Sequence, residues 1–336
     1  MAINVSSLKY QTNLITRAGE PYQLDNALIG LQWEEQISEL SQRASITVSN
    51  AKVGDKWLID IANLNCPVYI FANDGVSMEK VFDGTIWEWQ YSSATQKELT
   101  ITAYDMFIRL QQSKDFFYFA SGMDTKAIIS RICGEWNIPL SYTWGRTITH
   151  EKKTFSGNTI SDMIFTLLEE VRQRTGEKYI AYYRDDVLSI RGYGTNSSIY
   201  RFDFENTVQT YNKFTLNNLV TQVKIIGKED KSGRAPVEAI VKGDLQYGVL
   251  QEVIRRDSNK KLAAVMEDAN TIIKDRGRPE ETITVDVPDL PFLRKGDLVE
   301  VQAGNLLGFF YAEGVTHNAA ERRMKLTLSR SAERGA

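Results

Sequence analysis

The sequence predicts an α+β protein built mainly of antiparallel β-sheet, in which an α+β segment separates two β-rich regions. Runs of period-2 alternation fill residues 1–105 and return in residues 206–336, as is typical of half-buried antiparallel strands. Helical spacing dominates between them, in residues 106–205. A similar strand pattern at 66–105 and at 297–330 indicates that the two β-rich regions are related.

The repeated pattern is an apolar strand, a Gly-containing turn, an aromatic-led strand and a strand of strict alternation. An acidic residue followed by glycine lies in each middle strand, as Asp83-Gly84 in the first copy and Glu313-Gly314 in the second. Our hypothesis is that the β-domain is duplicated and that the two copies are equivalent hairpins. The alternative, that any two hairpins share so general a pattern, stays open.

The first β-rich region, residues 1–105, predicts several short strands separated by turn signals such as Asn73-Asp74-Gly75. The clearest strands are 28–33, 44–48, 68–71, 81–91 and 98–104. Strands of this length and spacing predict a small barrel or sandwich.

The middle region, residues 106–205, predicts two amphipathic helices followed by a hairpin. The first helix covers 125–136 with Asp124 as its cap, and the second covers 158–174 with Gly176 after its last turn. Strands at 179–183 and 187–191 follow, and the turn Asp185-Asp186 joins them.

The last region, residues 206–336, predicts a second β-domain that contains a helix and a small insertion at about 228–256. Its expected elements are strands at 209–216, 219–226 and 282–287, an exposed polar loop at 228–234, and a helix at 260–276 capped by Ser258.

Composition excludes several classes of protein. The 336 residues carry a net charge of −3, so no basic excess predicts sequence-specific nucleic-acid binding. No apolar run approaches the roughly 20 residues of a membrane span, and the N-terminus lacks the features of a signal peptide. Cys66 and Cys133 are expected to be buried, reduced thiols. We therefore expect a soluble protein made in a cytoplasm.

Residues with catalytic chemistry are few, and we expect no enzyme activity, no metal and no cofactor. The sequence HEKKT at His150 lacks the second histidine of a zinc helix, and His317 is interpreted as a surface or turn residue. Neighbouring carboxylates on a strand point to opposite faces, and Asp is favoured in turns for backbone reasons. The acidic pairs are Glu34-Glu35, Glu169-Glu170 and Asp185-Asp186.

Two aromatic groups are the candidate interaction residues. Trp87 and Trp89 have the i, i+2 spacing that places both on one face of a strand, and Phe116, Phe117 and Phe119 lie close together. Such groups can stack on sugars or bases, but they more often belong to a core or a subunit interface. We predict a partner interface for these five residues.

The order of motifs along the chain is similar to that of one protein family. FDGTIWEWQ, LTITAYDMFIRLQQS, an aromatic loop and DTKAIISRICGEWNIPL follow one another, and LPFLRKGDLVEVQ and GFFYAEGVTHNAAERRMKLTLSR come near the end. This order resembles the baseplate hub family of contractile phage tails, which includes the late control gene D type and the hubs of phage-like bacteriocins and defective prophages.

The resemblance implies two β-barrel domains like the tail-tube protein, a homotrimeric ring, and contacts with the tail tube protein, the spike protein and other baseplate proteins in the particle. A ring of three chains with two similar domains each would present six similar surfaces to a hexameric tube and three to a trimeric spike. The chain ends soon after its last expected strand, so we expect no fused lysozyme or peptidase domain. The alternatives are a tail-associated cell-wall hydrolase that uses carboxylates and a carbohydrate-binding module that uses Trp87 and Trp89.

Overall fold

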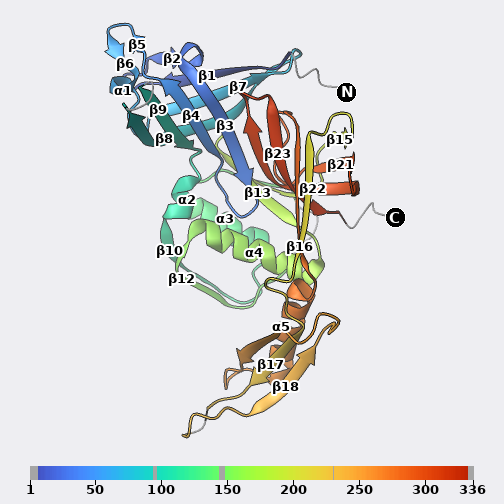
Figure 1. Ribbon diagram of the computed structural model, residues 1–336. Helices are drawn as coiled ribbons and strands as arrows, with labels where there is room; N and C mark the ends of the chain where they lie inside the picture. Colours follow the sequence, from blue (N-terminus) through green and yellow to red (C-terminus); the bar gives the residue numbers. More distant parts are fainter. Residues whose placement is uncertain (1–6, 94–96, 144–147, 230, 332–336) are drawn as a thin grey trace. The chain divides into compact units, whose positions relative to one another are not determined.

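The structure is a computed structural model that describes residues 7–93, 97–143, 148–229 and 231–331. The chain divides into two compact units, Met1–Thr210 with Thr284–Ala336 and Tyr211–Ile283. The predicted class is confirmed, because most elements are antiparallel strands and, along the chain, an α+β segment separates two β-rich parts (Figure 1). The expectations for both chain ends, for the turn at 94–96 and for position 230 lie outside the described residues.

One sheet of 13 strands contains both β-rich parts. Its first half consists of β1 (Lys9–Ile15), β2 (Pro21–Gln23), β3 (Leu28–Gln36), β4 (Arg43–Ser49), β7 (Pro67–Asn73), β8 (Met78–Ser92) and β9 (Glu98–Tyr104). The short elements η2 (Asp25–Ala27), β5 (Lys52–Val53), β6 (Lys56–Trp57) and α1 (Leu58–Ile61) lie between these strands. Alternation places Ile46 opposite Ile101 and Val48 opposite Leu99, and all four side chains are buried in the core of this half.

The second half of the sheet consists of β15 (Tyr200–Asp203), β16 (Gln209–Thr215), β20 (Glu280–Pro288), β21 (Leu298–Ala303), β22 (Leu306–Asn318) and β23 (Arg323–Arg330). The halves join where β22 pairs with β3, with His317 opposite Trp33. This pairing links residues almost 300 positions apart, so no local pattern could have predicted it.

Both halves of the sheet have the same strand order. The first half runs β3-β4-β9-β8-β7-β1, and the second runs β16-β20-β23-β22-β21-β15. Numbered along the chain within each half, and with the short strand β2 beside β1 left out, both read second, third, sixth, fifth, fourth, first. Two details differ. β1 is antiparallel to β7 whereas β15 is parallel to β21, and the extra residue of the bulge is Trp87 in β8 but Glu313 in β22.

The α+β segment between the halves contains α2 (Ile108–Gln112), β10 (Lys114–Phe119), α3 (Thr125–Glu135), β11 (Leu140–Thr143), β12 (Lys153–Thr159), α4 (Ile160–Thr175), β13 (Tyr179–Arg184) and β14 (Val187–Gly192). The predicted local signals lie at the ends of its helices. The Asp124 carboxylate accepts the amide hydrogen of Ala127 at the start of α3, and Gly176 ends α4 with φ 77°. Asp185 and Asp186 both have positive φ in the β13–β14 turn.

The second unit, Tyr211–Ile283, contains β17 (Gln222–Ile226), β18 (Val237–Lys242), β19 (Gln251–Arg255) and α5 (Leu262–Arg276). It includes the predicted small insertion at about 228–256. Its strands form a separate sheet in the order β18-β17-β19, and α5 packs on one face. The predicted cap Ser258 is wrong. The Asp257 side chain holds a turn by accepting the amide hydrogen of Asn259, so α5 begins later, with Lys261 as its N-cap residue.

Candidate functional site

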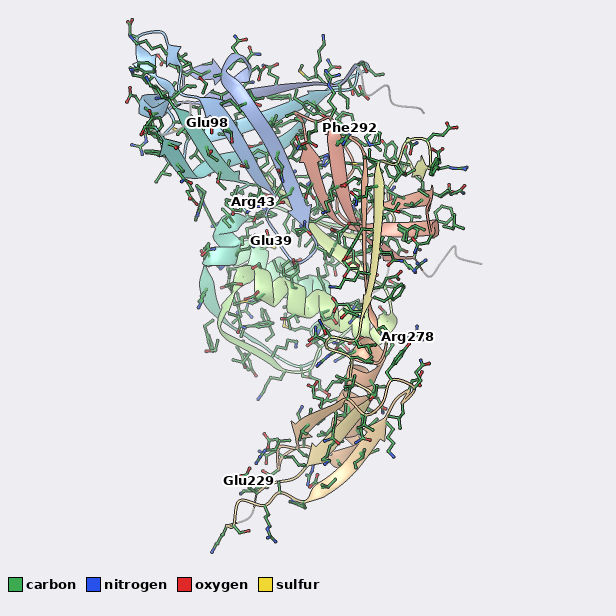
Figure 2. All side chains as sticks on the ribbon, in the orientation of Figure 1. Glu39, Arg43, Glu98, Glu229, Arg278 and Phe292 are labelled. Atoms are coloured by element: carbon green, nitrogen blue, oxygen red, sulfur yellow. The ribbon has the colours of Figure 1, made fainter. Side chains whose placement is uncertain are left out.

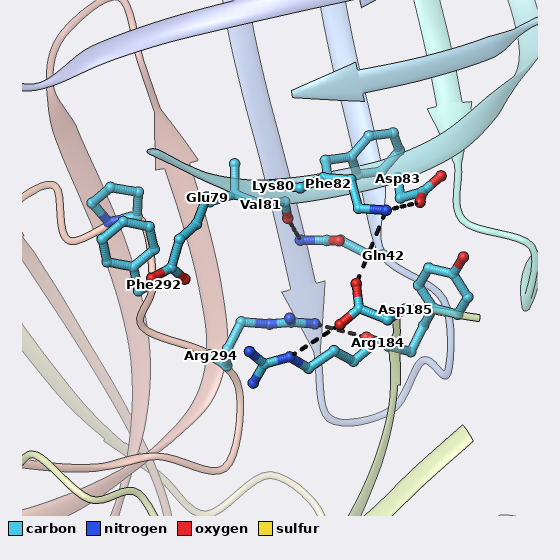
Figure 3. A pocket seen from close by; sticks show the side chains of 12 residues that line it. Gln42, Glu79, Lys80, Val81, Phe82, Asp83, Arg184, Asp185, Phe292 and Arg294 are labelled. Carbon is cyan, nitrogen blue, oxygen red and sulfur yellow. Dashed lines mark hydrogen bonds and ion pairs between the residues drawn. The ribbon is translucent and has the colours of Figure 1, made fainter. Parts of the chain in front are cut away.

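A cavity of about 450 Å³ opens in the first unit, between β8, the β13–β14 turn and the loop that precedes β21 (Figure 3). Ion pairs connect Lys80 to Asp83 and to Asp185 across it, and Arg184 pairs with Asp185 at 3.6 Å. Its lining residues are Gln42, Glu79, Lys80, Val81, Phe82, Asp83, Tyr183, Arg184, Asp185, Pro291, Phe292 and Arg294. Three cations balance three carboxylates, and the lining holds no histidine, cysteine, serine or threonine. The lining is therefore polar and carries no net formal charge.

The β3–β4 connector, residues 37–42, contributes Gln42 to the cavity lining and is held by buried polar groups. The Lys295 ammonium is 2 % exposed and donates to the backbone carbonyls of Gln36, Glu39 and Leu40. The Leu40 side chain enters the core of the α+β segment. The connector therefore fixes the position of this segment against both halves of the sheet.

Two buried charges next to the connector have strongly shifted pKa values. The Asp105 carboxylate accepts the amide hydrogens of Gln42 and Phe107, each at 2.8 Å. Burial raises the pKa of Asp105 to about 7, although these hydrogen bonds and Lys295 act in the opposite direction. Burial also lowers the pKa of Lys295 to about 8.

Arginine pairs complete the cluster around Lys295. Arg294 forms an ion pair with the buried carboxylate of Glu35, and the Arg191 guanidinium donates to Asp297 at 2.5 Å. Burial raises the pKa of Asp297, and Arg191 opposes that effect. Sequence reasoning missed this cluster because its members lie in four separate segments. As predicted for neighbouring carboxylates on a strand, Glu34 pairs separately, with Arg43.

His317 is not the surface residue that the sequence suggested. Its ring is 1 % exposed, and its Nδ1 lies 2.6 Å from Oδ1 of the buried Asp289. The Tyr10 hydroxyl donates to the other oxygen of Asp289, and the His317 ring stacks on Trp33 with centroids 4.6 Å apart. His317 is buried because β22 pairs with β3, and this pairing places the His317 ring against the Trp33 ring. The network joins strands from the two halves of the sheet.

Thr125, His150 and Glu170 have the geometry of a hydroxyl–imidazole–carboxylate triad. Thr125 Oγ1 lies 2.7 Å from His150 Nε2, and His150 Nδ1 lies 2.7 Å from Glu170 Oε2. However, Thr125 is 0 % exposed and His150 is 2 % exposed, so a substrate carbonyl has no access to the hydroxyl. Lys153 also pairs with Glu170. We interpret the network as structural, since it ties the start of α3 to α4 and to the strand β12.

The predicted aromatic interface is divided by the structure. Phe117 and Phe119 are 2 % and 0 % exposed and belong to the core of the α+β segment, so they are not available to a partner. Phe116 is 63 % exposed and faces the other way. The alternation in β10 explains this result and is visible in the sequence KDFFYF.

Trp87 and Trp89 are both partly exposed, at 43 % and 39 %, but they do not share a face. Trp87 is the bulge residue and packs edge-on against Tyr104, whereas Trp89 pairs with Ile101, three positions away on β9. Residues three apart on a strand point to opposite faces. The bulge therefore removes the flat two-tryptophan platform that the i, i+2 spacing predicted.

The described residues hold neither a metal site nor a membrane span. Within these ranges no group of three or more His, Cys, Asp or Glu side chains is placed to bind a metal ion. None of the helices there is long and apolar enough to cross a membrane. Cys66 and Cys133 are buried free thiols, and burial raises the pKa of Cys133 to about 12.

Comparison with solved structures finds the same fold in phage tail proteins. The prophage MuSo2 43 kDa tail protein from Shewanella oneidensis is 14% identical, with TM-score 0.71 over 96% of this chain and 98% of that one. A tail protein from Neisseria meningitidis MC58 is 13% identical, with TM-score 0.68 over 96% and 97%. Prophage tail protein gp18 from Listeria monocytogenes EGD-e is 13% identical, with TM-score 0.57 over 96% and 95%.

The sequence comparisons give the family. No curated protein matches the chain. The family model described as YQBQ-like matches residues 31–329, which is most of the sequence. The chain belongs to the YQBQ-like family.

Proposed function

We propose that this protein is a structural hub of the baseplate of a contractile phage tail or related injection particle. In this proposal three copies form a ring that joins a hexameric tail tube to a trimeric spike. The fold shared with phage tail proteins supports a structural role in a tail. The observation that carries the ring itself is the repeated strand order, β3-β4-β9-β8-β7-β1 and β16-β20-β23-β22-β21-β15.

The repeat supplies the geometry that such a junction needs. A hexamer cannot contact a trimer equivalently through every subunit unless each trimer chain offers two similar patches. Two halves with the same strand order provide two such patches per chain. Trp33, His317 and Asp289 are buried, and the half-buried Tyr10 donates to Asp289, so this network connects the two halves of the sheet.

Exposed aliphatic side chains at corresponding turns support an assembly role. Val76 in the β7–β8 turn is 90 % exposed, and Met78 beside it is 54 % exposed. Leu307, at the start of β22 after the β21–β22 turn, is 70 % exposed. Since β7–β8 and β21–β22 hold the same places in the strand order, these residues are our candidates for equivalent contacts with a tube. Permanent ring interfaces commonly bury more than about 2,000 Å².

Quantitative mass spectrometry of purified particles tests the proposal. Each tail should contain three copies of the chain, which is half the number of subunits in one hexameric ring of the tube. Absence from purified tails, or six copies per particle, would contradict it. As the matched control, particles from a strain that lacks the gene should contain no joined tube and spike.

A further inference from the structure

The sheet of the second unit has one face covered by α5 and one face uncovered. On the covered side Val223, Ile225 and Ala269 form the core. The carboxylates on that side are already paired, Glu238 with Arg256 and Glu252 with Arg276.

The uncovered face is formed by nine strand positions in three rows. Register places Lys242, Gln222 and Gln251 in the first row, Ile240, Lys224 and Val253 in the second, and Val237, Ile226 and Arg255 in the third. A hydrogen bond of 2.6 Å between Gln222 and Gln251 confirms that the side chains of a row share this face. We call these nine residues the open face.

The open face is both apolar and cationic. Val237, Ile240 and Val253 are 54 %, 44 % and 50 % exposed. Three of the nine positions are Lys or Arg and none is Asp or Glu, so every formal charge on the face is positive. Glu229, from the loop after β17 (Figure 2), pairs with Arg255 in the last row. The remaining charges are those of Lys224, in the middle row of the central strand β17, and Lys242, in the first row of the edge strand β18.

We propose that the open face binds an acidic amphipathic helix of another protein. A sheet with aliphatic side chains on both faces is the pattern of a sheet covered on both sides, and α5 shows that a helix fits this sheet. Three strands about 4.8 Å apart match the roughly 10 Å diameter of one helix. Leu or Ile on the helix would cover Ile240 and Val253, and its Glu or Asp would meet Lys224 and Lys242.

Two other occupants fit less well. The nine positions include no aromatic residue, so the face lacks the stacking groups by which proteins hold single-stranded nucleic acid. In a twofold contact between two copies, the open face would lie against the same face of the partner copy, and this would bring lysines against lysines, which repel one another.

Binding of a fluorescent helical peptide of Glu and Leu to the purified full chain tests this proposal. At low salt we expect binding that weakens about tenfold in the double variant Lys224→Glu, Lys242→Glu. The control Lys274→Glu, on exposed α5, should change the affinity by less than about twofold. Circular dichroism of both variants verifies that the unit is folded.

Four results would overturn the proposal: no binding, equal binding by the double variant, equal or tighter binding of the peptide with Lys in place of Glu, or tighter binding of a DNA strand. Acetylation of lysines gives an independent measurement. In the free chain the exposed Lys242 should react as fast as the exposed Lys274, and the half-buried Lys224 should react more slowly; the acidic peptide should protect both Lys242 and Lys224 but not Lys274. Protection without peptide would mean that the chain covers its own open face.

Discussion

Replacement of Asp105 by Asn should remove the fall in the free energy of unfolding that ionisation of Asp105 causes between pH 5 and pH 8. Asp105 is 0 % exposed, and its carboxylate holds the β3–β4 connector through the amide of Gln42. The Gln42 and Phe107 amides donate to different oxygens of Asp105, so an Asn side chain keeps only one of these hydrogen bonds and turns its NH2 group toward the other donor. That loss does not depend on pH, whereas the Asn side chain does not ionise, so the substitution isolates the pH-dependent cost of burying the Asp105 charge.

The sign follows from the raised pKa. Asp105 has a pKa of about 7 in the folded chain against 3.8 in the unfolded chain, so the folded state binds more protons between these values. Its contribution to stability is present at low pH and is lost as pH rises through the interval. Between pH 5 and pH 8 the loss is about 2–3 kcal/mol, since one pKa unit corresponds to about 1.36 kcal/mol.

Urea denaturation at several pH values from 5 to 8 gives the free energy of unfolding of the wild type and of Asp105→Asn. The difference between the two proteins at each pH measures the effect. The wild type should lose about 2–3 kcal/mol relative to Asp105→Asn across this range. The exposed control Asp55→Asn should follow the wild type. A difference between wild type and Asp105→Asn that stays constant, or that grows in favour of the wild type as pH rises, would refute the reasoning.

Three further outcomes are expected. Phe119→Ala should lower the free energy of unfolding by about 3–5 kcal/mol, whereas Phe116→Ala should change it by less than about 0.5 kcal/mol in the same urea titration. Gly84→Ala should destabilise more than Gly314→Ala, because the new Cβ would lie 2.4 Å from the rigid Tyr104 carbonyl in the first case and 2.3 Å from the movable end of Gln36 in the second; equal thermal midpoints would argue against this. The wild type should release no labelled peptidoglycan fragments, and release that His150→Gln abolishes would show that the buried triad is catalytic.

Local features of the fold could be predicted from the sequence because their causes are local. Asp124 and Gly176 end helices through their own neighbours, and Asp185-Asp186 forms a turn through its own backbone preference. Features that depend on distant partners could not. The burial of His317 requires β3, and the environment of Lys295 requires a connector more than 250 residues away.

The candidate interface was predictable only in part. The alternation within β10 separates Phe116 from Phe117 and Phe119 and could have been used. Trp87 and Trp89 point to different faces because a bulge leaves Trp87 without a paired residue on β9. A single sequence gives no clear signal of such a bulge. The repeated pattern predicts related halves, and the two halves have a common strand order. The two acidic–glycine pairs are not equivalent, because Glu313 is the bulge residue of β22 whereas the bulge residue of β8 is Trp87 and not Asp83.

A cryo-EM reconstruction of the tube–baseplate junction, refined with threefold and not sixfold symmetry, tests the central claim most directly. The account predicts three chains, each of which contacts two neighbouring tube subunits through its β7–β8 and β21–β22 turns, so that all six subunits of the tube ring are contacted at matching positions. A map in which only one half of each chain contacts the tube, or in which the two halves contact unlike partners, would contradict it.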